Sequence, residues 1–177
     1  MSTSTDGGLP NSATCAGELA AIPPSKDFRR GRAGAANMLP ASTGAALATT
    51  RALPGLAGKF DGVAIRVPVP VGSIADVTAV TARPVTREEV NDAFREEAAG
   101  GRYRGILGVA DDPVVSADII GDPRASVVDA AMTRVVDGIL VKVMAWYDNE
   151  WGFTCQMIRE AFAALGLPAP DLSQVEP

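Results

Sequence analysis

An alternating apolar run near the end of this sequence restricts its fold more than any other feature. Apolar side chains recur there at every second position, which is the period of a strand with one buried face. The positions are Ile139, Val141, Val143 and Ala145. This strand is predicted over 139–146, and further strands are predicted at 62–69, 73–82, 106–109 and 126–128. Because strand follows strand with few helical crossovers, the sequence predicts the α+β class and not a doubly wound parallel sheet.

Two helices carry complete start and stop signals. Thr86 and Glu89 form a capping box at the start of the first helix, which Gly100 ends. The second helix is predicted over about 154–165, with Gly166 as its stop signal. The residues expected on its core side are Phe153, Met157, Ile158, Phe162 and Leu165. A third, shorter helix is expected over 44–51.

The length of 177 residues, 47% of them hydrophobic, is enough for one core and too short for two ordinary domains. Residues 1–22 are rich in small and polar side chains, and we expect a flexible segment there. A single domain is expected over 23–167. We expect a disordered tail over 168–177.

Charge and hydropathy exclude several classes of partner. The net charge of -5 argues against nucleic acid, which usually needs a basic face. No apolar run approaches the roughly 20 residues that span a bilayer, and the first residues lack the pattern of a signal peptide. We therefore expect no membrane association and a cytoplasmic location. Cys15 and Cys155 lie far apart without metal-ligand spacing, so free thiols and no metal site are expected.

The absence of histidine from all 177 residues limits the available chemistry. Histidine is the side chain best suited to proton transfer near neutral pH. Acid–base work would fall to carboxylates, Tyr, Lys, Cys or water. The catalytic candidates are Asp148, Tyr147 and Cys15, with Asp27 and Glu150 as further carboxylates. Their spacing points to no specific mechanism.

Four segments resemble the catalytic domain of glyceraldehyde-3-phosphate dehydrogenases, in the order of that family. They are PSKDFRRGRAGAANMLPASTGAA (24–46), GVAIRVPVP (62–70), RGILGVADDPVVSADIIGDPRASVVDA (104–130) and VKVMAWYDNEWGF (141–153). The resemblance implies a large, mostly antiparallel mixed sheet with helices packed on one face. The other face of that sheet helps to build subunit interfaces in the family, which implies a homo-oligomer, a dimer or a tetramer.

The same resemblance implies that the parts needed for the family's reaction are missing. The family's NAD-binding domain precedes the matching region, and residues 1–22 are too short for a βαβ unit. The nucleophilic cysteine also lies upstream of the match, and the general-base histidine would fall at Ser12. Cys15 falls at a threonine that contacts phosphate in the family. We therefore expect no NAD and no phosphorylating dehydrogenase activity.

The residues that resemble the family's phosphate contacts remain. The resemblance implies that Thr43, Gly44 and Arg66 bind anionic groups, with Arg29 and Arg32 close by. Asn149 matches the residue that fixes the nicotinamide amide. The structural alternatives stay open: Arg66 could pair with Asp76, Asn149 could satisfy local backbone, and the arginines at 29–32 could lie in a solvated loop or a subunit interface.

Three functional hypotheses follow. The first is a repurposed, cofactor-independent enzyme of the cyclase, isomerase or dehydratase type, acting on a small molecule in a specialised biosynthetic pathway. The second is a non-catalytic protein that co-oligomerises with an intact dehydrogenase or senses a small anion. The third is a remnant that folds without a function; the well-formed helix caps argue against it.

Overall fold

The computed structural model describes residues 36–172 and divides the chain between Pro70 and Val71 into two compact units. The single domain over 23–167 stays a prediction, and the strand pairing explains the division into units. The first two strands pair only with each other, and the five strands after them form a separate sheet. Each unit therefore has its own hydrogen-bonded framework.

The first unit is a two-stranded antiparallel ribbon with a helical connection. Strand β1 (Leu39–Ser42) pairs with β2 (Val63–Arg66), so that Leu39 lies opposite Arg66 and Ser42 opposite Val63. Helix α2 (Ala45–Ala52) and the short η2 (Pro54–Leu56) connect them. The predicted short helix is confirmed. Strand β1 is missing from the sequence prediction, because Pro40 within it is unusual in a strand.

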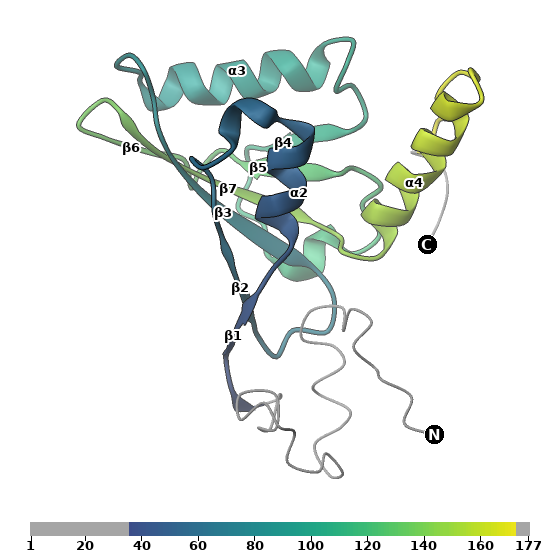
Figure 1. Ribbon diagram of the computed structural model, residues 1–177, viewed down its shortest axis with the longest axis horizontal. Helices are drawn as coiled ribbons and strands as arrows, with labels where there is room; N and C mark the ends of the chain where they lie inside the picture. Colours follow the sequence, from purple (N-terminus) through teal and green to yellow (C-terminus); the bar gives the residue numbers. More distant parts are fainter. Residues whose placement is uncertain (1–35, 173–177) are drawn as a thin grey trace. The chain divides into compact units, whose positions relative to one another are not determined.

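The second unit is built on a five-stranded sheet in the order β3-β7-β5-β4, with β6 also paired to β7. Only β4 and β5 are parallel to each other. Its elements are β3 (Ser73–Val80), α3 (Arg87–Ala99), β4 (Leu107–Ala110), η3 (Ser116–Ile119), β5 (Ser126–Asp129), β6 (Arg134–Val136), β7 (Leu140–Tyr147) and α4 (Trp151–Ala164). The expected α+β class and the mostly antiparallel mixed sheet are confirmed (Figure 1).

Strand β7 is the centre of this sheet. Three of its four predicted inward positions are confirmed, because Val141, Val143 and Ala145 are buried together with Val128 of β5. The fourth, Ile139, precedes the strand and is 37% exposed. Val90 and Phe94 of α3 pack against this cluster. The apolar side of α3 thus covers one face of the sheet.

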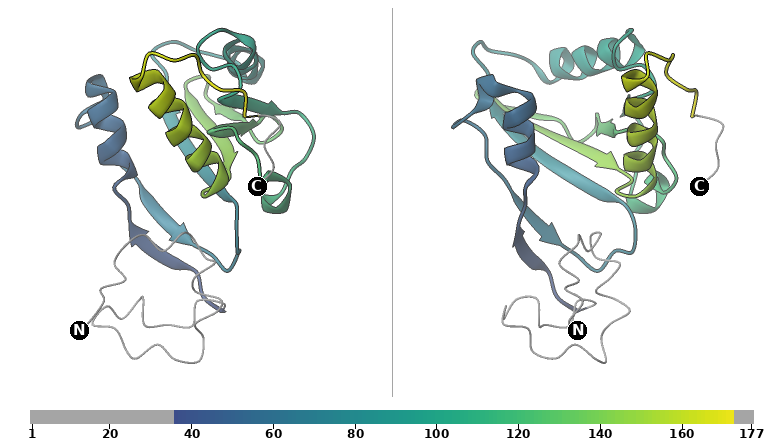
Figure 2. Two further views of the ribbon diagram at one scale, coloured as in Figure 1. Left: turned by 90° about the vertical axis from the view of Figure 1, so that its right-hand side faces the viewer. Right: turned by 45° about the vertical axis from the view of Figure 1, so that its right-hand side comes forward.

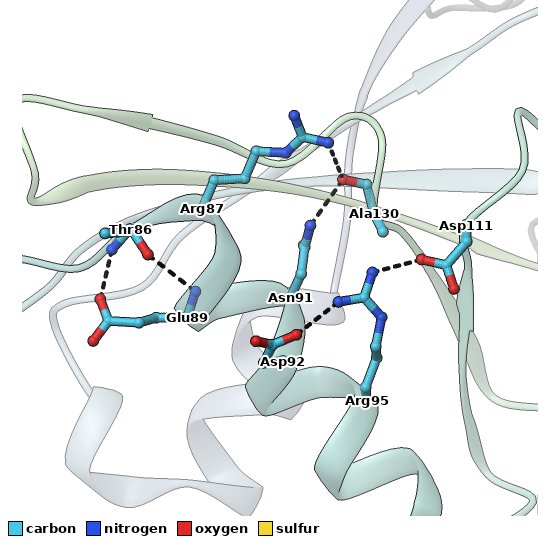
Figure 3. A network of polar contacts seen from close by, with 8 residues as sticks. All are labelled: Thr86, Arg87, Glu89, Asn91, Asp92, Arg95, Asp111 and Ala130. Atoms are coloured by element: carbon cyan, nitrogen blue, oxygen red, sulfur yellow. Dashed lines mark hydrogen bonds and ion pairs between the residues drawn. The ribbon is translucent and has the colours of Figure 1, made fainter.

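Polar contacts at its start and in its middle hold α3 in place over the sheet. Its capping box is confirmed: Thr86 Oγ1 accepts from Glu89 N–H, and Glu89 Oε2 accepts from Thr86 N–H. Farther along, Asn91 donates to the Ala130 carbonyl (3.0 Å), and Arg95 pairs with Asp111 (Figure 3). These contacts tie the helix to the strand ends beneath it.

Helix α4 begins at Trp151 and turns a different face inward from the one the sequence predicts. Gly152 and Cys155 are its buried residues, whereas Phe153 and Met157 are 64% and 55% exposed. Of the five residues expected on the core side, only Phe162 is half-buried. The helix approaches a neighbouring turn so closely at Gly152 that its small face, not its large apolar face, lies inward. Figure 2 shows α3 and α4 running in clearly different directions.

Helix α4 ends just before Gly166, the stop signal that the sequence predicts. Gly166 has a φ of 68°, its N–H donates to the Ala163 carbonyl, and the Leu167 N–H donates to the Phe162 carbonyl (2.9 Å). This is a Schellman motif, which favours glycine at the left-handed position. The sequence predicts disorder from residue 168, but Leu172 is only 7% exposed, so the chain packs back as far as that residue.

None of the helices between residues 36 and 172 combines the length and apolar character that crossing a bilayer requires.

Candidate functional site

Asn149 lies in the turn after β7, where the start of β3 runs beside it. Ser73 and Tyr147 are opposite each other in the sheet, which brings residues 72 and 73 to this turn. The Asn149 Oδ1 accepts hydrogen bonds from the Gly72 N–H (3.1 Å) and the Ser73 hydroxyl (3.4 Å). Its Nδ2 is buried and has no hydrogen-bond partner among residues 36–172. The Oδ1 of this amide is therefore held by two donors, whereas its Nδ2 has no acceptor among the described residues.

Gly72 holds its place because no larger residue fits there. Its φ is 93°, and a Cβ at this position would lie 2.7 Å from the Ser116 carbonyl oxygen. Side chains other than glycine are strained at such a φ. The backbone N–H that anchors Asn149 is thus fixed by the turn that leads into β3.

The Asp148 carboxylate is buried and accepts hydrogen bonds from three backbone N–H groups. Its side chain is 3% exposed, and its Oδ1 accepts from the N–H groups of Glu150 (2.8 Å) and Trp151 (2.7 Å). The Oδ2 accepts from the Gly121 N–H (2.8 Å). A carboxylate with three backbone donors satisfies the free N–H groups at the start of α4 and fixes the adjoining turn. This geometry favours a positioning role over the catalytic role that the sequence suggests.

The other two catalytic candidates differ in how far the structure describes them. Tyr147 is half-buried and shares the sheet face of Val143 and Ala145. Cys15 lies outside the described residues and stays a prediction, as do Asp27, Arg29 and Arg32.

Cys155, which the sequence identifies as a free thiol, is free and buried. Burial raises the pKa of its thiol; Arg159 opposes the rise, and the carboxylates of Asp148 and Asp122 add to it. Since the thiolate is the nucleophilic form, this cysteine is poorly suited to covalent chemistry. Cys155 belongs to the buried face of α4.

The turn at 121–125 supports α4 from the side. Gln156 of the helix donates to the Pro123 carbonyl (2.8 Å), and Arg124 pairs with Asp122 through a fork of hydrogen bonds. Burial opposes ionisation of Asp122, but the hydrogen bonds and charge of Arg124 outweigh it, so the pKa of that carboxyl lies below its ordinary value. A Cβ at Gly108 would overlap the present position of the Arg124 guanidinium, which would have to move to another side-chain conformation.

Arg66 lies at the end of β2, on the same face of the ribbon as Leu39, which is buried. The guanidinium is half-buried and makes no hydrogen bond or ion pair with any residue in the described part of the chain. Asp76, the partner that the sequence left open for Arg66, forms an ion pair with Lys142 (2.8 Å). Arg66 thus resembles an anion contact more than a structural ion pair.

Thr43 and Gly44 lie at the other end of the same ribbon. The Thr43 Oγ1 accepts from the Ala45 N–H (3.1 Å) at the start of α2, and the space where a Gly44 side chain would lie is open. Four residue steps separate Thr43 from the position opposite Arg66, which is about 13 Å along the strand. The structure does not bring these residues into one direct contact site, so a ligand touching both would need two separated acceptor groups.

Sequence reasoning identified Asn149 but missed the residues that orient it. Gly72 and Ser73 donate to Asn149, and Gly121 donates to the neighbouring Asp148. These contacts join distant parts of the chain, so a local sequence pattern does not predict them. Within residues 36–172, no group of acidic or cysteine side chains is placed to hold a metal ion.

Comparison with known proteins agrees with the resemblance in the sequence. The chain is 50% identical over 135 residues to glyceraldehyde-3-phosphate dehydrogenase 2 of Streptomyces avermitilis and 49% identical to the glyceraldehyde-3-phosphate dehydrogenase of Streptomyces coelicolor. The enzyme of Kitasatospora aureofaciens is 53% identical over the same length. Each match covers 76% of this chain and 40% of the relative, so the chain spans less than half of the curated relatives it matches.

The family model for the glyceraldehyde 3-phosphate dehydrogenase C-terminal domain matches residues 13–149. That range includes both strands of the ribbon and all five strands of the second sheet. The chain therefore belongs to the glyceraldehyde-3-phosphate dehydrogenase family.

Proposed function

We propose that this chain is a repurposed dehydrogenase-type catalytic domain that binds a small anionic molecule and does not carry out the phosphorylating oxidation. Its reaction is of the cyclase, isomerase or dehydratase type, in a specialised biosynthetic pathway, and uses no nicotinamide. The sequence supports this proposal at one position. Ser12 stands where the family's general-base histidine falls, and no histidine occurs anywhere in the 177 residues. A serine hydroxyl does not titrate near neutral pH and cannot replace an imidazole as the partner of a thiolate.

The observation that carries the proposal is the state of Arg66. A half-buried guanidinium has given up part of its hydration, and among the described residues it gains no carboxylate in return. An anionic ligand would restore the missing partner and accept bidentate hydrogen bonds. Acid–base work would fall to Tyr147 or Glu150, because the Asp148 carboxylate is fully occupied by backbone donors.

Arg66→Ala is expected to weaken the binding of inorganic phosphate by about 10- to 100-fold, because it removes a charge-assisted contact worth about 1.5–3 kcal/mol. Isothermal titration of wild type and variant with phosphate checks this, and circular dichroism confirms that the variant is folded. Arg51→Ala is the matched control, since Arg51 is an exposed arginine in the last turn of α2. Equal phosphate affinity in wild type and Arg66→Ala would remove Arg66 from the proposed site.

A second candidate function is assembly, and the sheet face opposite α3 favours it. Val80, Val136 and Leu140 lie side by side on that face and are all exposed, and the ion pair between Asp76 and Lys142 lies next to them. Exposed apolar patches with polar neighbours are typical of interfaces. The candidate partner is a second copy of the chain or an intact dehydrogenase of the family.

For assembly, we expect co-elution of this chain with a full-length family dehydrogenase in gel filtration at micromolar concentration. Leu140→Asp would place a charge on the exposed apolar face and is expected to abolish the shared peak. Glu160→Asp, an exposed and conservative change in α4, is the control. Separate peaks for the wild-type proteins would exclude this partner.

A further inference from the structure

We infer that an exposed apolar face of α4 packs against the same face of a second copy of this chain, as an antiparallel helix pair. This surface, named here the outer face of α4, consists of Phe153, Met157 and Ile158 of the helix and Leu165 at its C-terminal end. It lies in the second unit, and it is separate from the sheet face around Leu140. The inference does not depend on the proposed anion binding.

The outer face is exposed because α4 turns its small residues inward. Gly152 is buried against the turn at 121–125, where carbonyl oxygens leave no room for a side chain. On the opposite side of the helix, Phe153, Met157 and Leu165 are 64%, 55% and 73% exposed. Figure 1 shows α4 at the margin of the second unit, away from α3. The contact at Gly152 thus keeps the large apolar residues of α4 in solvent.

The outer face is also nearly uncharged. Arg159 and Glu160 are the charged residues of α4, and Arg159 is half-buried, with its Nη1 donating to the Gly105 carbonyl (2.6 Å). Glu160 is therefore the one charged side chain that α4 exposes. The solvent side of a surface helix ordinarily carries charged and polar residues, and a helix that binds a lipid surface carries basic ones. Another apolar, uncharged protein surface fits this face better than water or a membrane.

The distribution of large and small residues makes the outer face complementary to itself. Phe153, Met157 and Ala164 lie on one side of α4, at positions i, i+4 and i+11. The large residues belong to the first half of the helix, and the exposed Ala164 is its last residue. In an antiparallel pair with two-fold symmetry, Met157 of each copy meets Ala164 of the other, so large packs beside small. The opposite partial charges of the helix ends also meet in this arrangement.

The area of the outer face is sufficient for a weak dimer. Its residues are 38–73% exposed, and Ala164 and Leu167 beside them are exposed as well. A large side chain such as phenylalanine offers about 150–250 Å² when it is fully exposed, so two copies would bury roughly 1,000 Å² together. Specific interfaces begin at about this size. We therefore expect a dissociation constant on the order of 10 µM.

Sedimentation velocity of the full chain, over concentrations on both sides of this constant, tests the dimer. Met157→Lys is expected to weaken it at least 10-fold, because the interface would then bury an unpaired charge. Met157→Leu keeps the size and apolar character of the side chain and should stay within about 3-fold of wild type. Circular dichroism checks that each variant is folded.

Leu140→Asp is the matched control, since it places a charge on the sheet face and should leave a dimer formed through α4 unchanged. A wild-type chain that stays monomeric at every concentration would overturn the inference. A dimer that Met157→Lys does not weaken would overturn it too, and loss of the dimer in Leu140→Asp alone would assign the interface to the sheet face.

The antiparallel arrangement is tested by NMR on a mixture of two samples, one with carbon-13 in its methionine methyl groups and the other with carbon-13 in its alanine methyl groups. Met157 and Ala164 are about 10 Å apart along one helix, too far for a nuclear Overhauser effect within a copy. A cross-peak between their methyl groups therefore supports antiparallel pairing between copies. Its absence from a dimer that Met157→Lys dissociates would overturn that arrangement.

Discussion

Asp148→Ala is expected to lower the free energy of unfolding by about 3–5 kcal/mol. The substitution leaves the N–H groups of Gly121, Glu150 and Trp151 without their acceptor, and hydrogen bonds to a charged group contribute about 1.5–3 kcal/mol each. The total stays below their simple sum because the turn can relax and admit water. Urea denaturation followed by tryptophan fluorescence measures the change, since Trp151 directly follows this turn.

Two control variants help to assign the loss of stability in Asp148→Ala to the missing carboxylate. Asp148→Asn keeps one oxygen acceptor and is expected to cost about half as much, because its NH2 must then face one of the backbone donors. Asp112→Ala removes an exposed carboxylate and should change stability by less than about 0.5 kcal/mol. A loss in Asp148→Ala as small as that in Asp112→Ala would mean that the carboxylate does not hold the turn, and would restore Asp148 as a catalytic candidate.

The features predicted correctly from the sequence are those whose cause lies within a short window. The alternation along β7 needs only one buried face, and the capping box of α3 needs only Thr86 and Glu89. Strands β1 and β6 were not predicted, because one contains Pro40 and the other has only three residues. In each case the pairing partner, and not the local pattern, makes the segment a strand.

The orientation of α4 shows where local patterns stop being informative. The large apolar residues of this helix predict the buried face, yet Phe153 and Met157 are exposed. What sets the rotation is the contact between Gly152 and the carbonyls of Asp122 and Arg124, almost 30 positions earlier. A hydrophobic stripe shows which face favours burial, but not which neighbour the chain brings to it.

The candidate site shows the same difference between what local sequence predicts and what contacts between distant residues decide. Motif resemblance led to Asn149, whereas the direction of its amide depends on a backbone N–H at Gly72. Resemblance also placed Thr43 and Arg66 together, and the antiparallel register puts them at opposite ends of the ribbon. Residue type predicts the chemistry available to a site, and register decides which groups can act on the same ligand.

Gly152→Val is expected to lower the free energy of unfolding by about 3 kcal/mol, although helix propensity alone favours replacing a helical glycine. Propensity would improve by up to about 1 kcal/mol. Against this gain, a Cβ at Gly152 would lie 2.7 Å from the Arg124 carbonyl oxygen and 3.2 Å from that of Asp122. These are backbone atoms that cannot rotate away, and overpacking of this kind costs about 1–3 kcal/mol, occasionally more. Valine adds two methyl groups to the conflict, and urea denaturation measures the sum.

Ala161→Val is the matched control, because it adds the same β-branch to the exposed part of the same helix and should cost only about 0.5 kcal/mol. Gly152→Ala should fall between the two variants. The sign of the Gly152→Ala effect decides which force positions α4: destabilisation means that close packing against the turn at 121–125 fixes the helix. A stabilised Gly152→Ala would instead mean that the helix has room to shift, that propensity dominates, and that the large apolar face of α4 is free to turn toward the sheet.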